Sequence, residues 1–292
     1  MKYFNIAGPC NNQDHYMIDS ATRLSGVEQL IDMKQYFVIH AARQSGKTTY
    51  IQDLAYRLNA DGKYYVLYCQ LDKVQNISDA GIGIPAIVRV IQNALYFTKI
   101  PHRLDFAKDV NFEDFTGVLN FSLSQFCTLL DKPLVIFFDE ADCLSGETLL
   151  LFLRQLRGGY IDRAVVPFVH SVALVGMRNI RDYKAKIRPD SETLGSASPF
   201  NVVTKSLTLN NFTKDEIVQL YRQHTDETGQ KFKSDAVELV FEQTQGQPWL
   251  VNAIAREITD EILQFDYKKP VTAELVKQAI QTIIQNRPTH ID

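Results

Sequence analysis

Residues 36–50 read YFVIHAARQSGKTTY, and this stretch decides the expected fold. An apolar run at residues 36–40 is followed by a match to Ala-x-x-x-x-Gly-Lys-Thr at residues 41–48 and then by a helix-like segment. A strand, a loop and a helix in this order are the context of a phosphate-binding P-loop. Backbone N–H groups of such a loop point into one concavity, and the helix N-terminus adds a partial positive charge. The stretch therefore predicts a phosphate site.

The loop supplies most of the expected nucleotide contacts. Gly46 permits close approach of the backbone, Lys47 can reach the β- and γ-phosphates, and the Thr48 hydroxyl can ligate magnesium. The loop residues predicted to bind nucleotide are Ala42, Arg43, Gln44, Ser45, Gly46, Lys47, Thr48 and Thr49.

The composition is that of an ordinary globular protein. The 292 residues are 45% hydrophobic and 22% charged, which suits one large or two modest domains. A formal net charge of -3 and a pI of about 6.1 give no electrostatic reason to expect strong nucleic-acid binding. A locally basic stretch at residues 178–188 is the best candidate for such binding, and we interpret it as a solvated face.

Cysteine usage and hydropathy indicate a cytoplasmic protein. The four cysteines are scattered, without a Cys-x-x-Cys pair or a nearby histidine at ligand spacing. The first residues lack the apolar stretch of a signal peptide, and no run approaches 18 apolar residues. We therefore expect no zinc site, no disulfide framework and no membrane span.

Apolar runs alternate with segments of helical spacing up to about residue 209. Strands are expected at residues 36–40, 64–71, 134–138, 171–176 and 202–209. Helices are expected at residues 47–59, 84–95, 112–130 and 145–157, with Gly158 and Gly159 ending the last of them. This alternation predicts βαβ units and a parallel sheet.

From residue 210 the pattern becomes entirely helical. Helices are expected at residues 213–224, 234–244, 248–265 and 272–286. Thr213 and Glu216 have the spacing of a capping box. The sequence thus predicts a P-loop α/β domain with an N-terminal extension at residues 1–209 and a smaller helical lid at residues 210–292.

A second chemical signal is LVIFFDE at residues 134–140, where a buried strand ends in two carboxylates. The carboxyl end of a central parallel strand is where α/β sheets bind ligands. Asp139 is expected to hold the metal and its water shell, and Glu140 to polarise the attacking water. The alternative is an ordinary strand end, which the upstream phosphate loop argues against.

Two further signals are weaker. Arg178 follows the strand at residues 171–176 and could contact the γ-phosphate, with Asn179 as a competing candidate. The GQPWL segment at residues 246–250 opens a helix, and Pro248 and Trp249 offer an apolar surface for a base. A helix start with a core tryptophan explains the same residues.

These features together resemble the P-loop ATPases of the AAA+/STAND group, particularly bacterial AAA-like ATP-binding proteins and archaeal-type ATPases. The resemblance rests on AARQSGKTT, LVIFFDE, LVGMR and GQPWLV, and on FNIAGP and DHYMI near the start. It implies a parallel-sheet P-loop NTPase core of the ASCE/AAA+ type with a helical lid, and it implies that Pro248 touches the adenine. Ala41 departs from the usual glycine, and Trp249 follows Gly-x-Pro where many AAA+ lids place an arginine.

The sequence is compatible with three functions. The first is magnesium-dependent ATP hydrolysis, with Lys47, Glu140 and Arg178 as catalytic residues and Thr48 and Asp139 as metal ligands. The second is a nucleotide-dependent switch whose output is lid position, homo-oligomerisation or binding of a protein partner. The third and least favoured is a DNA-associated initiator or transposition-type ATPase. ATP is favoured over GTP because no Asn-Lys-x-Asp-type loop is found.

Overall fold

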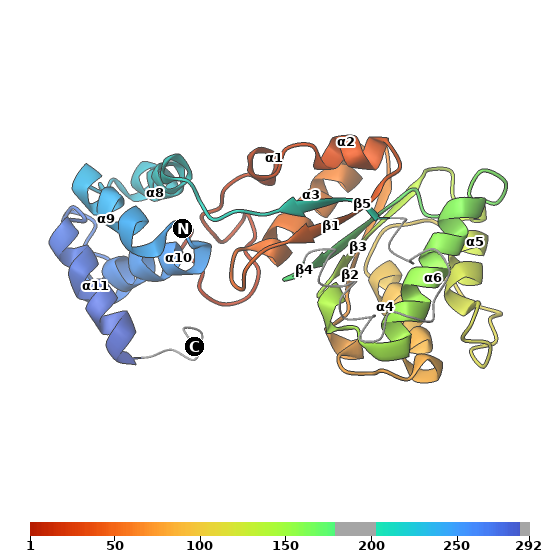
Figure 1. Ribbon diagram of the computed structural model, residues 1–292. Helices are drawn as coiled ribbons and strands as arrows, with labels where there is room; N and C mark the ends of the chain where they lie inside the picture. Colours follow the sequence, from red (N-terminus) through yellow and green to blue (C-terminus); the bar gives the residue numbers. More distant parts are fainter. Residues whose placement is uncertain (179–202, 287–292) are drawn as a thin grey trace. The chain divides into compact units, whose positions relative to one another are not determined.

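The computed structural model describes residues 1–178 and 203–286 of the chain. Within these residues, five parallel strands form one sheet in the order β2-β3-β4-β1-β5 (Figure 1). The predicted parallel sheet is therefore confirmed. The strands are β1 (Tyr36–His40), β2 (Tyr65–Gln70), β3 (Leu134–Asp139), β4 (Ser171–Gly176) and β5 (Val203–Thr208).

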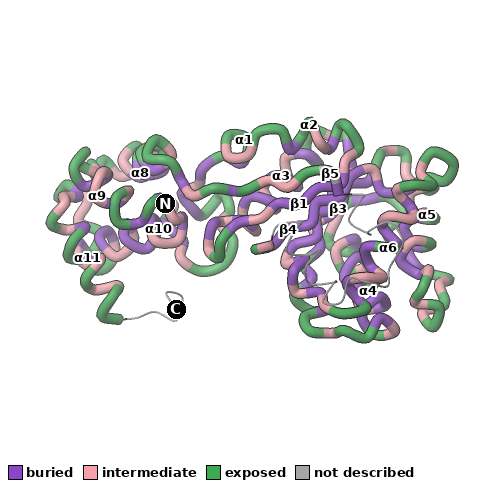
Figure 2. The backbone as a smooth tube through the Cα atoms, in the orientation of Figure 1, coloured by how far each residue is buried: buried purple, intermediate pink, exposed green. Residues whose placement is uncertain are grey.

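The interior strands are buried along their whole length. Every residue of β3 and β4 is buried, and β1 is exposed only partly and only at His40. In Figure 2 these strands are accordingly drawn in purple. Strands covered on both faces have continuous apolar sequences. The bounds predicted from the apolar runs therefore agree closely with those of the observed strands.

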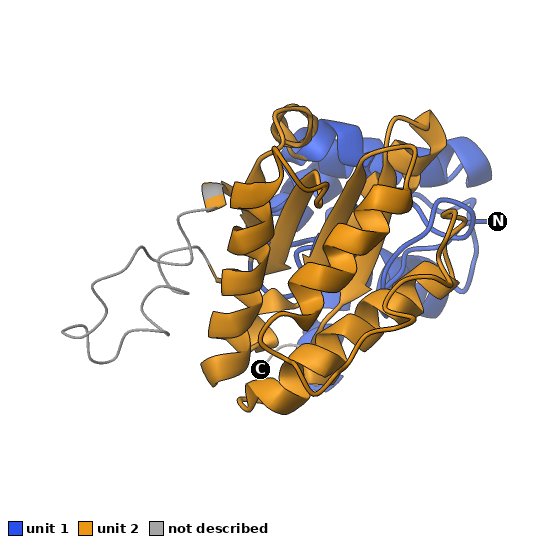
Figure 3. Ribbon diagram, turned by 90° about the vertical axis from the view of Figure 1, so that its right-hand side faces the viewer, with its two compact units in different colours: residues 1–23, 42–50, 209–292 blue, residues 24–41, 51–208 orange. Residues whose placement is uncertain are grey.

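Three helices form a layer against the sheet (Figures 1 and 3). They pack on one another, and their apolar side chains share a core with β1, β2, β3 and β4. The layer consists of α4 (Ala80–Tyr96), α5 (Val118–Leu129) and α6 (Gly146–Asp162). The shorter α2 (Val27–Asp32) contacts β1 and β4, and α3 (Lys47–Asp61) follows the phosphate loop.

The expected end of α6 at its glycine pair is wrong. The helix continues through Gly158 and Gly159 to Asp162. A Cβ at Gly159 would lie 2.3 Å from the ring of Phe168, whereas one at Gly158 would meet Asn120 Nδ2 at 3.4 Å. Gly159 is thus needed for close packing of the helix on Phe168, and it does not act as a helix terminator.

The C-terminal helices follow the prediction with one refinement. They are α8 (Lys214–Thr228), α9 (Ser234–Thr244), α10 (Pro248–Arg256) and α11 (Ala273–Asn286). The helix expected at residues 248–265 consists of α10 followed by a π-helical turn at Glu257–Ile262. The predicted capping box of α8 is confirmed, because the Thr213 hydroxyl accepts from Glu216 N at 3.2 Å and Glu216 Oε2 accepts from Thr213 N at 2.7 Å.

The chain divides into two compact units, coloured separately in Figure 3. The sheet unit contains residues 24–41 and 51–208, and the helical unit contains residues 1–23, 42–50 and 209–292. Most of the phosphate loop is thus grouped with the C-terminal helices, whereas the sequence analysis grouped it with the sheet. The division into domains at residues 209 and 210 stays a prediction.

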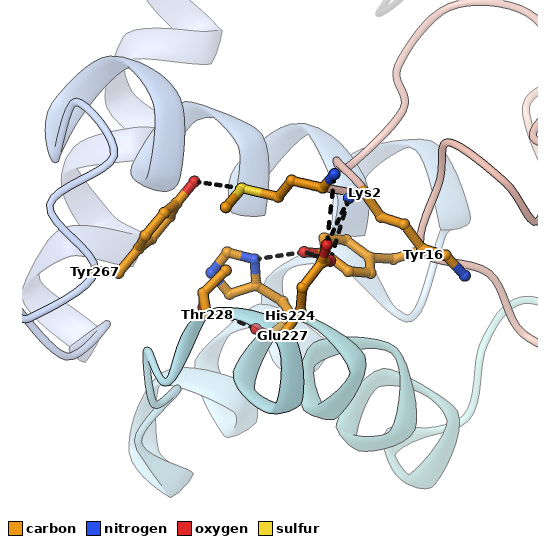
Figure 4. Close-up of polar contacts among 7 residues, drawn as sticks. Lys2, Tyr16, His224, Glu227, Thr228 and Tyr267 are labelled. Carbon is orange, nitrogen blue, oxygen red and sulfur yellow. Dashed lines mark hydrogen bonds and ion pairs between the residues drawn. The ribbon is translucent and has the colours of Figure 1, made fainter.

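The N-terminal segment is part of the core of the helical unit. Phe4 and Tyr16 are each 2% exposed and pack among the apolar residues of α8–α11. Around them, Tyr16 OH donates to Glu227 Oε2 at 2.8 Å and lies 3.2 Å from His224 Nδ1 (Figure 4). Glu227 also accepts the backbone N–H of Lys2 at 3.1 Å, so the segment is held by both apolar and polar contacts.

No helix within the described residues has the length and apolar character needed to span a bilayer.

Candidate nucleotide site

The phosphate loop connects the end of β1 at His40 to the start of α3 at Lys47. Two of its residues have left-handed backbone conformations, Gln44 with φ 59° and Gly46 with φ 82°. Glycine adopts this conformation without strain, which gives a local reason for Gly46 in the pattern. Gln44 adopts it at a cost, and such backbone strain is concentrated at functional sites.

Lys47 and Ser45 are both buried residues of the phosphate loop. Lys47 is 7% exposed, and its Nζ donates to the carbonyl of Ala42 at 2.8 Å, so the ammonium group crosses the loop. Ser45 is 1% exposed, and its Oγ has no hydrogen-bond partner among the described residues. A buried hydroxyl without a partner needs an explanation, and a phosphate oxygen held in the loop would supply one. The donor set fits a bound phosphate.

The first turn of α3 connects the loop to the N-terminal segment. Thr49 Oγ1 accepts the backbone N–H of Cys10 at 3.0 Å. The preceding Thr48 is half-buried, as expected for a residue at the mouth of a loop. Ala42 and Arg43 are exposed.

The start of α10 lies beside the loop within the helical unit. Gln247 is the N-cap of α10: its Oε1 accepts from Leu250 N at 2.7 Å, and its Nε2 donates to Gln44 Oε1 at 3.4 Å. Pro248 is the first residue of the helix and is buried. Trp249 is half-buried, and its indole N–H donates to the carbonyl of Ile6 at 2.9 Å, so this ring holds the N-terminal segment.

The two predicted acidic residues stand at the end of β3 in the sheet unit. Asp139 is fully buried; its Oδ2 accepts from the Tyr68 hydroxyl and its Oδ1 from the backbone N–H of Glu140, both at 2.9 Å. Glu140 has φ 55° and precedes the short 3₁₀ turn Ala141–Cys143. Burial and the charge of Asp139 raise the pKa of Tyr68 far above its ordinary value, so Tyr68 remains a donor.

Arg178 is half-buried two residues beyond β4, the strand between β3 and β1. The backbone N–H of Ala41 donates to the carbonyl of Gly176 at 3.2 Å, so the chain enters the phosphate loop at the carboxyl end of β4. Because the strands are parallel, the ends of β1, β3 and β4 share one edge of the sheet. The competing Asn179 and most of the basic stretch at residues 178–188 lie outside the described residues.

Three further residues at these sites were not predicted from the sequence. Tyr68 supports Asp139 from the neighbouring strand, and Gln247 reaches the loop from α10. Arg23, at the end of α1 (Ser20–Arg23), lies beside Gly46. Tyr68 had a local signal, as a polar-tipped residue near the end of a buried strand, and Gln247 lies within the GQPWL segment already singled out. The contact of Gln247 with Gln44 and the position of Arg23 beside Gly46 join segments that are distant in the sequence.

Comparison with solved structures identifies the fold. The chain is similar to a Walker-type ATPase of Pyrococcus abyssi, with a TM-score of 0.64, 13% identity and coverage of 97% of this chain and 77% of that one. It is also similar to Cdc6p of Pyrobaculum aerophilum, with a TM-score of 0.58, 15% identity and coverage of 90% and 69%. A third similar structure is the ORC1 protein of Aeropyrum pernix in complex with DNA, with a TM-score of 0.55 and 16% identity. That match covers 89% of this chain and 65% of the ORC1 chain.

No family model matches the sequence, and no curated protein matches it. At these identities the structural likeness shows the fold. The chain has the fold of the P-loop ATPases of the AAA+ kind, with a parallel sheet and an additional helical portion.

Proposed function

We propose that this protein binds ATP with magnesium and hydrolyses it, coupling the reaction to a conformational change or to assembly. The phosphate loop carries the proposal. Its left-handed Gly46, the Lys47 side chain folded across it and the unsatisfied Ser45 hydroxyl together fit a bound phosphate. The AAA+-like ATPase fold supports this assignment.

Each residue has a role that its chemistry suits. On binding, Lys47 exchanges the Ala42 carbonyl for phosphate oxygens. Thr48 and Asp139 are the expected metal ligands, and Tyr68 orients the Asp139 carboxylate. Magnesium, when bound, neutralises charge that develops on the phosphates. Glu140 polarises the attacking water, and Arg178 contacts the γ-phosphate.

We further propose adenine as the base. Pro248 begins α10, whose N-cap Gln247 contacts the loop, and this contact supports a base-binding role for the first turn of α10. The resemblance to the AAA+/STAND group implies that Pro248 touches the adenine, and it motivates this assignment.

Replacing Glu140 with Gln tests hydrolysis. The variant should retain ATP binding because the phosphate loop is unchanged, while its steady-state turnover falls by about 100-fold or more. Rapid filtration with labelled ATP should then recover uncleaved nucleotide on the protein. Turnover equal to that of the natural chain removes Glu140 from its proposed role.

A switch with little turnover is the second candidate, and the Gln44–Gln247 contact favours it. Because this contact joins the phosphate loop to α10, a nucleotide that reshapes the loop also acts on the helices. Size-exclusion chromatography with ADP and with a non-hydrolysable ATP analogue should give different elution volumes. Identical volumes combined with rapid turnover favour the enzyme.

A further inference from the structure

Arg23 is a buried cation at the end of α1. Its side chain is 7% exposed, and its Nε lies 3.5 Å from Glu216 Oε1. Its Nη2 donates to the carbonyl of Asn210, and the guanidinium carbon lies 4.6 Å above the centre of the Phe212 ring. All these partners belong to the chain entering α8 and its first turn.

One corner of the guanidinium faces the phosphate loop. Nη1 lies 3.8 Å from the position that a Cβ on Gly46 would occupy. It forms no hydrogen bond to any residue in the ranges 1–178 and 203–286. An arginine N–H without a protein acceptor, beside the glycine of a phosphate loop, is a donor available to an anion.

The charge of Arg23 is incompletely compensated within the protein. Burial lowers the pKa of Arg23, and the nearby carboxylate of Glu216 opposes that effect. Arginine nevertheless stays protonated in proteins. Among the residues that the structure describes, the buried Nε has no hydrogen-bond partner, and its one charged neighbour is Glu216 Oε1 at 3.5 Å. A phosphate at Nη1 would therefore stabilise a charge that the fold has already removed from water.

The Glu216 carboxylate makes two interactions at once. Its Oε2 accepts the backbone N–H of Thr213 and completes the capping box of α8, while its Oε1 faces Arg23. An anion on the other side of the guanidinium competes with Glu216 for the same positive charge. The Arg23–Glu216 pair is thus the point where occupancy of the loop can act on the first turn of α8.

We propose that Arg23 is a phosphate-binding residue that connects nucleotide occupancy of the loop to α8. With nucleotide bound, Nη1 donates to a phosphate oxygen, and the attraction between Arg23 and Glu216 weakens. This inference rests on the proposed function, since it requires phosphate in the loop.

A double-mutant cycle tests the proposal. The affinities of the full chain for ADP and for a non-hydrolysable ATP analogue are measured by calorimetry for the natural sequence, R23Q, E216Q and the double variant. Gln at position 216 keeps the capping box, because Gln also serves at this position. R23Q should weaken binding of both nucleotides by about 10- to 100-fold, the range for a charge-assisted hydrogen bond.

The sign of the E216Q effect separates this role from a structural one. Removing the competing carboxylate should tighten nucleotide binding several-fold, and the gain should vanish in the R23Q background. If Arg23 only braces the start of α8, E216Q weakens binding, and that result overturns the proposal. Unchanged affinity in R23Q, or in E216Q, overturns it as well.

The controls keep the two hypotheses distinguishable. A natural chain that binds neither nucleotide contradicts the proposed function and this inference with it. Binding by the natural chain that R23Q leaves unchanged contradicts only the role of Arg23. If R23Q does not fold by circular dichroism, E216Q decides the outcome alone, since it retains both capping bonds.

Discussion

The hydroxyl of Tyr68 on β2 donates to Oδ2 of Asp139 at the end of β3, at 2.9 Å. The other carboxylate oxygen accepts the backbone N–H of Glu140 at the same distance. Two donors on opposite oxygens fix the orientation of a carboxylate that is fully buried. Partners of this kind orient metal ligands and tune their affinity.

Replacing Tyr68 with Phe should raise the magnesium concentration needed for half-maximal ATPase activity by about 10-fold, because Asp139 loses one orienting donor. Nucleotide affinity without magnesium should change little. A magnesium titration of turnover checks this expectation. Tyr65→Phe is the matched control, because the Tyr65 hydroxyl bonds to the distant Asp131. An equal shift in both variants would argue against a role for Tyr68 at the metal.

Gly246 should be intolerant of a side chain. A Cβ there would lie 1.8 Å from the carbonyl oxygen of Phe212, at φ 71°. Gly246→Ala should therefore lower the free energy of unfolding by about 3 kcal/mol or more. Gly229 has a similar φ of 79°, and a Cβ there would have no described residue within 4 Å, so Gly229→Ala should lower the free energy of unfolding by only about 1–2 kcal/mol. Chemical denaturation compares them, and equal losses would show that backbone strain alone matters.

The two glycines within α6 should respond oppositely to alanine. Gly158→Ala should raise the free energy of unfolding by up to about 1 kcal/mol, since alanine favours helix and its Cβ meets only Asn120. Gly159→Ala should lower it by about 1–3 kcal/mol, because its Cβ overlaps the Phe168 ring. Thermal melting of both variants checks the order, and a stabilising Gly159→Ala would contradict the packing explanation.

The helical unit should lose stability on mild acidification. Burial lowers the pKa of His224 below 6.5, although a hydrogen bond with Gln230 and the charges of Glu227 and Asp260 oppose this effect. The unfolded chain therefore binds the proton more readily than the folded chain. The stabilisation is complete above pH 6.5 and is lost as the pH falls toward the lowered folded pKa.

Urea denaturation between pH 7 and pH 5, followed by circular dichroism, measures this loss. His224→Gln should flatten the dependence, because the titrating group is removed. A slope that persists unchanged in this variant assigns the pH dependence to other groups.

The fold was predictable where local pattern and tertiary structure agree. The apolar run at Ser171–Gly176 predicted β4 to the residue, because a buried parallel strand needs only continuous apolar side chains. The end of α6 was not predictable, since helix-terminating glycine and close-packed glycine have the same sequence signal. Only the position of Phe168 distinguishes the two.

The candidate site likewise contains residues that local sequence pattern predicts and residues that only tertiary contacts reveal. The phosphate loop is one continuous segment, and Asp139 and Glu140 are adjacent residues. Sequence pattern alone was therefore enough to propose both as candidate site residues. Arg23 contacts Asn210 across 187 residues, and no local pattern carries that information. The packing of Phe4 and Tyr16 among the C-terminal helices was missed for the same reason.

Calorimetric titration of ATP, ADP and GTP into the natural chain and into Lys47→Ala decides whether the phosphate loop binds nucleotide. We expect the natural chain to bind ATP and ADP, to bind GTP more weakly, and to lose at least about 10-fold in ATP affinity when Lys47 is replaced with Ala. Absence of ATP binding by the natural chain, or equal ATP affinity in the two proteins, would contradict the assignment of this loop as a nucleotide site.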